Sequence, residues 1–228
     1  MALETLFAKY DRLFLFDTET TGLSYSRDEI IEFAAVVVEN RQGKPEITAQ
    51  YDELISLSPG GFVPPQIQQL TGISNEDLRE KGIPKTRLCC DIARMIAGNT
   101  LLLAYNAHFD LSFLYSLLLR DGDPMILRGK DKLDLLTVYK DRRSYPHKLC
   151  NAIEAYGLQD QVVNSHRAVD DVIATVAVME KMEEERNDLH NYVNLFGYNA
   201  KYGISGKAIG SVTYKPQPYD PAKPLYEA

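Results

Sequence analysis

Acidic residues occur in this sequence at the points where apolar runs stop. FLFDTETTGL ends an apolar run in Asp17 and Glu19, two positions apart, and YNAHFD places Asp110 after a second run, at the start of a predicted helix. In an open α/β sheet, chemistry collects at the carboxyl ends of the strands, so these carboxylates are expected to meet there. Carboxylates that meet repel one another unless a cation lies between them, and oxygen ligands suit hard cations such as Mg²⁺ or Mn²⁺.

A third segment, SHRAVDD, adds a histidine and two further acids, His166, Asp170 and Asp171. Two divalent ions about 3.5–4 Å apart stabilise both the attacking and the leaving oxygen of a phosphoryl displacement. A histidine beside them is suited to take a proton from the attacking water. A single Asp at a helix start is more often a cap than a ligand, but the joint pattern of residue types and spacing favours a metal site.

The apolar patterns predict the elements that would position these residues. A three-strand meander is predicted for RLFLF, EIIEFAAVVVEN and ITAQYDELIS, and later strands for TLLLAYN and the start of DKLDLLTVYK. Helices are predicted for PQIQQLTG, a segment capped by Ser74, IPKTRLCCDIARMIAG, HFDLSFLYSLLLRDG, HKLCNAIEAYG and the stretch that SHRAVDD opens. This order predicts an α/β fold, a mixed five-stranded sheet flanked by helices.

Composition and charge limit the class of protein. The 228 residues are 45% hydrophobic and 25% charged, which is enough for one well-formed core. The formal net charge of -7 argues against a broad electrostatic grip on long nucleic acid, although bound cations can supply positive charge locally. Three cysteines without CxxC spacing predict reduced thiols, and no apolar run is long enough to span a membrane. A cytoplasmic location with no membrane partner is expected.

The chain is expected to divide near residue 190. Residues 1–190 would form the catalytic domain, and residues 191–228 a C-terminal tail rich in Tyr, Gly and Pro. Tyr and Lys of this tail could stack on bases, or its Tyr and Pro could pack along the domain surface, and the second interpretation is favoured.

Three segments, in order, resemble the motifs of the DEDDh 3′–5′ exonucleases: FDTETTGL, NAHFDLSFL and HRAVDDV. That family includes the proofreading epsilon subunit of bacterial DNA polymerase III, the exonuclease insert of the Gram-positive replicative polymerase, and ribonuclease T. IQQLTGIS, DLLTVYK and HKLCNAI resemble the intervening segments, so the resemblance covers residues 12–185. It implies a ribonuclease H-like fold and release of nucleoside 5′-monophosphates, one at a time, from a 3′ end.

The resemblance also implies roles for single residues. Four acids would be the ligands of two Mg²⁺ or Mn²⁺ ions: Asp17, Glu19, Asp110 and Asp171. His166 would be the general base, and the H-x-A-x-x-D spacing leaves Asp170 as a surface acid. Four more residues would contact the terminal nucleotide, with turn chemistry and core packing as the alternative: Thr20, Leu23, Asn106 and Phe109.

Polar residues after the fourth predicted strand have simpler interpretations. Asp134 could support a metal ligand or cap a helix, and the cap is favoured. Arg142, Arg143 and Lys148 could meet a phosphate backbone, although a solvated loop is the more ordinary interpretation.

Three functional hypotheses follow. The first is a metal-dependent exonuclease acting on the 3′ end of single-stranded DNA, alone or beside a polymerase or another replication or repair protein. The second keeps this chemistry and changes the substrate to RNA, which no motif excludes. The third is a non-catalytic module that binds nucleic acid or a polymerase on the same fold, since a fold does not fix a function.

Overall fold

The central sheet has five strands and mixes both pairing directions. In this computed structural model, which describes residues 3–195, 198–199, 203–204 and 223–227, the strands are β1 Arg12–Thr20, β2 Ile30–Arg41, β3 Lys44–Leu54, β4 Thr100–Ala104 and β5 Lys132–Asp134. Their order is β3-β2-β1-β4-β5, with β1–β2 and β2–β3 antiparallel and β1–β4 and β4–β5 parallel. The predicted meander and mixed five-stranded sheet are confirmed. A separate short pair consists of β6 Tyr198–Asn199 and β7 Gly203–Ile204.

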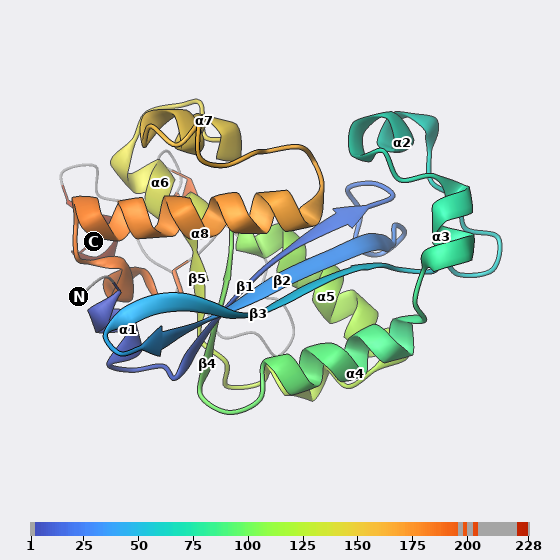
Figure 1. The fold of residues 1–228 in the computed structure, drawn as a ribbon, viewed down its shortest axis with the longest axis horizontal. Coiled ribbons are helices and arrows are strands. Elements are labelled where there is room, and N and C mark those ends of the chain that lie inside the picture. The colour runs from blue at the N-terminus through green and yellow to red at the C-terminus, as the bar shows by residue number, and fades with distance from the viewer. Residues whose placement is uncertain (1–2, 196–197, 200–202, 205–222, 228) are drawn as a thin grey trace.

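Helices cover both faces of this sheet (Figure 1). The α-helices are α1 Glu4–Phe7, α2 Pro65–Thr71, α3 Asn75–Lys81, α4 Lys85–Met95, α5 Ala107–Asp121, α6 Leu135–Arg142, α7 Leu149–Ala155 and α8 Ala168–Glu185. Short 3₁₀ turns are η1 Pro124–Leu127, η2 Leu189–Tyr192 and η3 Leu225–Glu227. Helices α6, α7 and α8 pack in the core on one face, and α4 and α5 pack on the other. Within the described ranges, no helix has the length and apolar character needed to cross a bilayer.

Alternation along β1 separates the two layers of the core. Odd-numbered residues, beginning with Leu13, pack toward α8, and even-numbered residues, beginning with Phe14, pack toward α5. Successive side chains of a strand point to opposite faces, and burial on both faces makes the strand apolar throughout. The same alternation directs Asp17 and Glu19 to the α8 face and Thr18 to the α5 face.

Strand β1 is longer than the run RLFLF predicts. Its pairing with β2 continues through Asp17 to Thr20, so the two acids lie within the strand instead of following it. Strand β4 pairs only with residues 12–15 of β1. The β4 side of β1 is therefore unpaired at Asp17, and side chains from other elements can approach the acids there.

Local signals in the sequence set most helix ends. Ser74 and Asp77 form the predicted capping box at the start of α3, and α2 ends at Gly72 in a left-handed conformation (φ 72°). Helix α4 ends at Met95, before the predicted Gly98, because Gly98 (φ 76°) belongs to the turn that leads into β4.

The packed core continues past residue 190. Tyr192 and Leu195 are buried on the α8 side of the sheet, and Leu225 joins the same cluster. Most of the segment 191–228 that the sequence predicts as a tail lies outside the described residues.

Candidate active site

Strand β1 presents two acids on one face of the sheet. Asp17 and Glu19 are both directed toward α8, and Glu19 lies directly opposite Glu32 of β2 in the antiparallel register. The strand is held on its β2 side along its whole length, so the spacing of the two carboxylates is fixed by backbone pairing.

Asp110 reaches the unpaired side of β1 from the first turn of α5. Its Oδ1 accepts two hydrogen bonds from Thr18, one from the backbone N–H (3.0 Å) and one from Oγ1 (2.7 Å). Asp110 is 2% exposed, so these bonds fix a buried carboxylate beside the strand. Thr18 was not predicted from the sequence as a site residue. The hydroxyl residue between the two acids of DTE was its only signal.

The start of α5 is held from β5. Asn106, with a left-handed backbone (φ 73°), precedes the helix and gives it no side-chain cap. Asp134 supplies that cap, because its Oδ1 accepts the N–H groups of Asn106 and Ala107, both at 3.0 Å. Asp134 also caps α6, as predicted, through the N–H of Leu136 (3.2 Å) and the hydroxyl of Thr137 (2.6 Å). One buried carboxylate thus positions the helix that carries Asp110.

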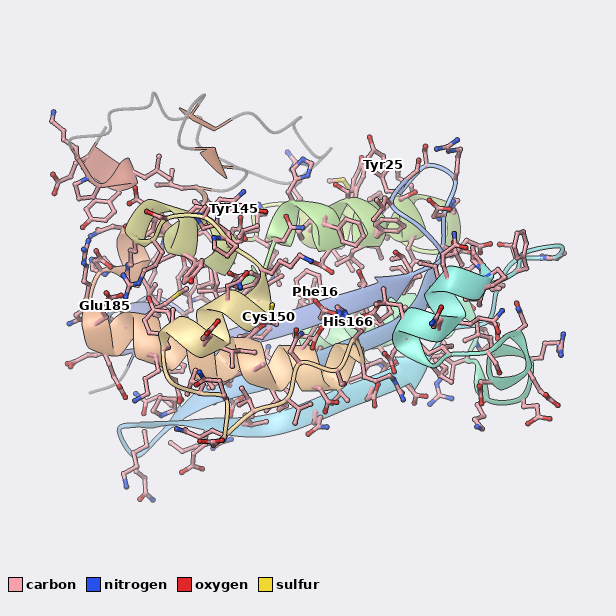
Figure 2. All side chains as sticks on the ribbon, turned by 90° about the horizontal axis from the view of Figure 1, so that it is seen from above. Phe16, Tyr25, Tyr145, Cys150, His166 and Glu185 are labelled. Atoms are coloured by element: carbon pink, nitrogen blue, oxygen red, sulfur yellow. The ribbon has the colours of Figure 1, made fainter. Side chains whose placement is uncertain are left out.

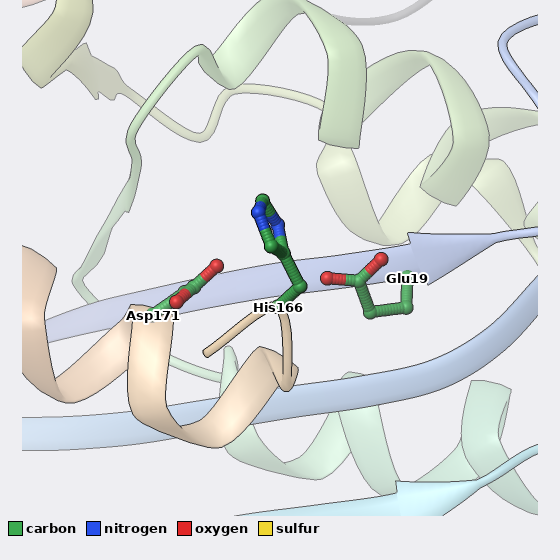
Figure 3. Close-up of side chains that lie close together, drawn as sticks. All are labelled: Glu19, His166 and Asp171. Carbon is green, nitrogen blue, oxygen red and sulfur yellow. The ribbon is translucent and has the colours of Figure 1, made fainter. Parts of the chain in front are cut away.

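His166 and Asp171 complete the cluster from the beginning of α8. Atoms of Glu19, His166 and Asp171 that could bind a metal all lie within 4.8 Å of one another (Figure 3). Asp171 is buried, and its Oδ1 accepts a hydrogen bond from Asn164 Nδ2 (2.6 Å). His166 is exposed and adopts a left-handed backbone (φ 57°), an uncommon conformation for a residue with a Cβ.

The neighbouring Asp170 faces elsewhere. Its carboxylate accepts a hydrogen bond from the hydroxyl of Ser165, and it does not line the cavity that contains Asp171. The two adjacent acids of AVDD therefore have different surroundings.

The clustered carboxylates hold their protons more tightly than ordinary ones. Burial first, and then the charges of Asp110 and Asp171, raise the pKa of Asp17 well above its usual value. Burial, with Asp171 and Glu32 nearby, raises the pKa of Glu19 to about 8. Burial also raises the pKa of Asp110 to about 7, although the Thr18 hydrogen bonds oppose this shift. Arg167 opposes the shift at Glu19 but does not offset it, so negative charge dominates among the described residues of the cluster.

This donor set fits hard divalent cations. Carboxylate oxygens and one imidazole converge, and their mutual repulsion would be relieved by a cation. The two acids of β1 with Asp110 and Asp171 could hold such ions, and His166 is close enough to act beside them.

All five residues line one cavity of about 780 Å³. Across from the acids, the wall comes from α6 and the segment between α6 and α7. It carries Lys140, Tyr145, His147 and Lys148, and Figure 2 labels Tyr145 of this wall together with His166 and Cys150, which also line the cavity. Tyr105 fixes this wall, because its hydroxyl donates to the backbone carbonyl of His147 (2.9 Å). We call Lys140, Tyr145, His147 and Lys148 the basic wall.

The four predicted nucleotide contacts separate into two pairs. Asn106 and Phe109 line the cavity, and the Phe109 ring contacts Phe113 with centroids 4.9 Å apart. Thr20 and Leu23 are not among the cavity residues. Thr20 is buried with its hydroxyl bonded to the carbonyl of Gly22 (2.7 Å), which is the turn chemistry given as the alternative. Leu23 is 87% exposed, which excludes the core-packing alternative for this residue.

The two arginines of RRSYPHK are engaged in ion pairs. The side chain of Arg142 has 0% exposure and pairs with Asp188 and with Glu185 at 3.3 Å. Arg143 pairs with Glu185 at 2.7 Å. The predicted phosphate contact is wrong for Arg142, as is the solvated-loop alternative, because its charge is satisfied inside the fold. Of the three cations, Lys148 lines the cavity.

The chain matches a family of known proteins. The family model of the RNase_T exonucleases matches residues 14–179, from β1 into α8. The chain is 35% identical over 161 residues to the DNA polymerase III subunit epsilon of Treponema pallidum, a match that covers 68% of this chain and 69% of that protein.

Longer relatives contain a similar segment. The chain is 31% identical over 194 residues to the PolC-type DNA polymerase III of Latilactobacillus sakei, a match that covers 83% of this chain and 12% of the relative. The chain therefore spans only a small part of such a relative. The structure of E. coli Exonuclease I in complex with a dA16 oligonucleotide has a TM-score of 0.69 at 22% identity, covering 84% of this chain and 44% of that chain. The predicted α/β, ribonuclease H-like fold is confirmed by this likeness.

Proposed function

The chain belongs to the RNase_T exonuclease family, and on that premise we propose that it is a metal-dependent 3′–5′ exonuclease that acts on single-stranded DNA in preference to RNA. One observation carries the proposal: acids from β1, α5 and α8 converge with His166 on a single cavity. A module that only binds nucleic acid has no need to bury several carboxylates against one another, because that burial costs stability.

Four carboxylates would hold two divalent cations, Mg²⁺ or Mn²⁺: Asp17, Glu19, Asp110 and Asp171. When bound, such ions stabilise negative charge on the attacking and leaving oxygens of a phosphoryl displacement. The residues of the chain contribute position. Thr18 fixes Asp110 through two hydrogen bonds, and Asn164 fixes Asp171 through one.

His166 would act as the general base. A ring nitrogen accepts the proton that a water molecule loses as its oxygen attacks the terminal phosphorus. The bond between this phosphorus and the 3′ oxygen of the preceding nucleotide breaks, that oxygen takes up a proton from solvent, and the last nucleotide is released as a nucleoside 5′-monophosphate. Because His166 is exposed, it can pass the proton on to solvent.

The basic wall supports a polyanionic substrate. Lys140 and Lys148 lie in the same cavity as the acids, on a chain whose overall charge is -7. A nucleic-acid strand whose last phosphodiester before the 3′ end lies at the acids could place its next phosphates along the basic wall. Tyr145, 85% exposed at the rim, offers a ring on which a base could stack.

The names of the relatives indicate DNA and a polymerase partner. One relative is a subunit of DNA polymerase III, and the Exonuclease I structure holds a DNA oligonucleotide. We therefore extend the proposal to a role beside a replicative polymerase or another replication or repair protein.

The test is a time course on single-stranded DNA and RNA of equal sequence, each labelled at the 3′ or 5′ end. Reactions contain Mg²⁺, Mn²⁺ or EDTA, with Asp17→Ala run in parallel. Stepwise, cation-dependent shortening from the 3′ end that the variant lacks supports the proposal. The DNA-to-RNA rate ratio then decides the preferred substrate. Binding of both strands without any cleavage would instead favour a non-catalytic module.

A further inference from the structure

Glu32 is a buried acid outside the cavity. It lies on β2 directly opposite Glu19, and its exposure is 0%. It faces α8, as do Ala34 and Val36 on the same strand. These other positions of β2 are filled by apolar residues, and a carboxylate in such a layer loses hydration and lies beside a like charge. The fold retains a charge at a position where an apolar residue would pack more easily.

Among the described residues, the hydrogen-bond donors to Glu32 all belong to the start of α8. Its Oε1 accepts from Nε (2.8 Å) and Nη2 (2.5 Å) of Arg167, and its Oε2 accepts the backbone N–H of Ala168 (2.8 Å). Arg167 stands at the N-cap position and provides no side-chain cap of its own. Glu32 therefore accepts the first N–H of α8 and also binds the side chain of the N-cap residue, Arg167.

We call the hydrogen bonds from Arg167 and Ala168 to Glu32 the anchor. The anchor lies between two parts of the site. The carbonyl of Arg167 accepts the N–H of Asp171 (3.2 Å), and His166 is the residue directly before Arg167. The other end of the anchor is fixed to Glu19 by the β1–β2 register. A short chain of contacts thus runs from Glu19 through Glu32 to the segment that carries His166 and Asp171.

We propose that Glu32 is a positioning residue that sets His166 and Asp171 in register with Glu19. The inference rests on the proposed exonuclease function. His166 depends on this support because it is exposed and its backbone is left-handed, so it has few contacts of its own to hold it. A shift of about 1 Å in a reacting group can cost on the order of a hundredfold in rate.

The first test compares Glu32→Gln with Glu183→Gln. Glu183 is a matched control, because it is 5% exposed and its carboxylate accepts bonds from Thr5 Oγ1 (3.1 Å) and the Leu189 N–H (3.2 Å), away from the cavity. We expect Glu32→Gln to lower kcat by about 10–100-fold with KM changed less than about threefold, as for other residues that orient a site. The control should keep kcat within about twofold of wild type at a similar loss of melting temperature.

A double-mutant cycle tests whether Glu32 acts through His166. If it does, Glu32→Gln should cost less in a His166→Ala background than in wild type, because one of the two groups that it positions is already absent. Full additivity, or an unchanged kcat in the single variant, would overturn the proposal.

Hydrogen exchange tests the anchor without any need for activity. The Ala168 amide should exchange about tenfold faster or more in Glu32→Ala than in wild type, while amides in the middle of α8 keep their protection. Unchanged exchange at Ala168 would reject the anchor even in an active enzyme. Wild type that lacks nuclease activity but shows the exchange effect would instead reject the proposed function alone.

Discussion

Helix α8 has a cluster of buried charge at each end, and the fold treats the two in opposite ways. His166 and Glu185 mark the two ends in Figure 2. At the C-terminal end, the buried guanidinium of Arg142 is paired with Glu185 and Asp188. At the other end, none of the four site carboxylates forms an ion pair with Lys or Arg in the part of the chain that the structure describes.

The contrast distinguishes charge that serves the fold from charge that serves chemistry. Removing a charge from water costs several kcal/mol, and a partner of opposite sign offsets that cost. Around Arg142 the partner is part of the chain. Around Asp17 the described residues offer no such partner, and under the proposed function a bound cation would supply it. Each of the following experiments tests this difference between the two ends of α8.

The largest effect is expected from Asp17→Asn. Loss of one ligand should lower turnover at least about a thousandfold, because each metal contributes several kcal/mol to the transition state. The same change removes a repelling charge, so the metal-free protein should melt at a higher temperature than wild type. Activity assays and thermal unfolding in EDTA measure the two effects. A variant that is inactive and also less stable would show that the acid serves the fold.

The opposite outcome is expected from Arg142→Met. It should lower the free energy of unfolding by about 3 kcal/mol, because two acids lose a buried partner. The rate of nuclease action by the folded protein should stay within about twofold of wild type. Denaturant titration measures the change, and Arg143→Met is the control. Arg143 is 32% exposed and pairs with the same Glu185, so its loss should cost less than about 1 kcal/mol.

The next largest effect is expected to be a difference in kcat between substitutions of the two adjacent acids at the start of α8. Asp171→Asn should lower kcat by about a hundredfold, since Asp171 lies in the cavity beside Glu19 and His166. Asp170→Asn should change kcat by less than about threefold, because this acid bonds only to Ser165 among the described residues. Steady-state kinetics on a labelled strand compares the two variants. The reverse ranking would mean that the ligand has been assigned to the wrong acid.

The smallest effect is a pH dependence of the metal-free protein. Glu19 has a pKa of about 8 in the folded state, well above its ordinary value of 4.5, so the folded chain binds more protons than the unfolded chain between these values. The free energy of unfolding contributed by the cluster should therefore fall as pH rises from about 4.5 to about 8.

Subtracting the curve of a Glu19→Gln variant isolates this contribution from other titrating groups. The melting temperature of the variant should exceed that of wild type by a margin that grows with pH, to several degrees, at about 2–4 °C per kcal/mol. Saturating Mg²⁺ should lift the wild-type curve most at high pH. If the melting temperatures of wild type and variant in EDTA changed in parallel with pH, the carboxylates would not repel one another.

Features encoded over short distances could be predicted from the sequence. The period-2 and period-3.6 apolar patterns gave the five strands and the main helices, and the S-x-x-D pattern gave the capping box at Ser74. Asp17, Glu19 and Asp110 were predicted to meet because strand ends and helix starts meet in this type of sheet, and all three line one cavity, although the first two lie within β1. Here a local pattern and the global fold agree.

Features that depend on a distant partner could not be predicted. Arg142 looked like a solvated residue in a polar loop, yet Asp188 binds it from 46 positions further along the chain. Thr18 bonds to Asp110 across 92 positions, and Glu32 to Arg167 across 135. No periodicity records such pairs, because they follow from strand register and from where a loop turns back.

The shared cap at Asp134 has a mechanical consequence. One carboxylate holds the first N–H groups of α5 and also the start of α6, so the two helices are pinned at a common point. Helix α5 carries Asp110, one of the acids that line the cavity, and α6 carries Lys140 on the opposite side. Asp134 thus joins the starts of the two helices that form opposite sides of the cavity. Because Asp134 is bonded to both helices, a displacement of α5 would also act on α6.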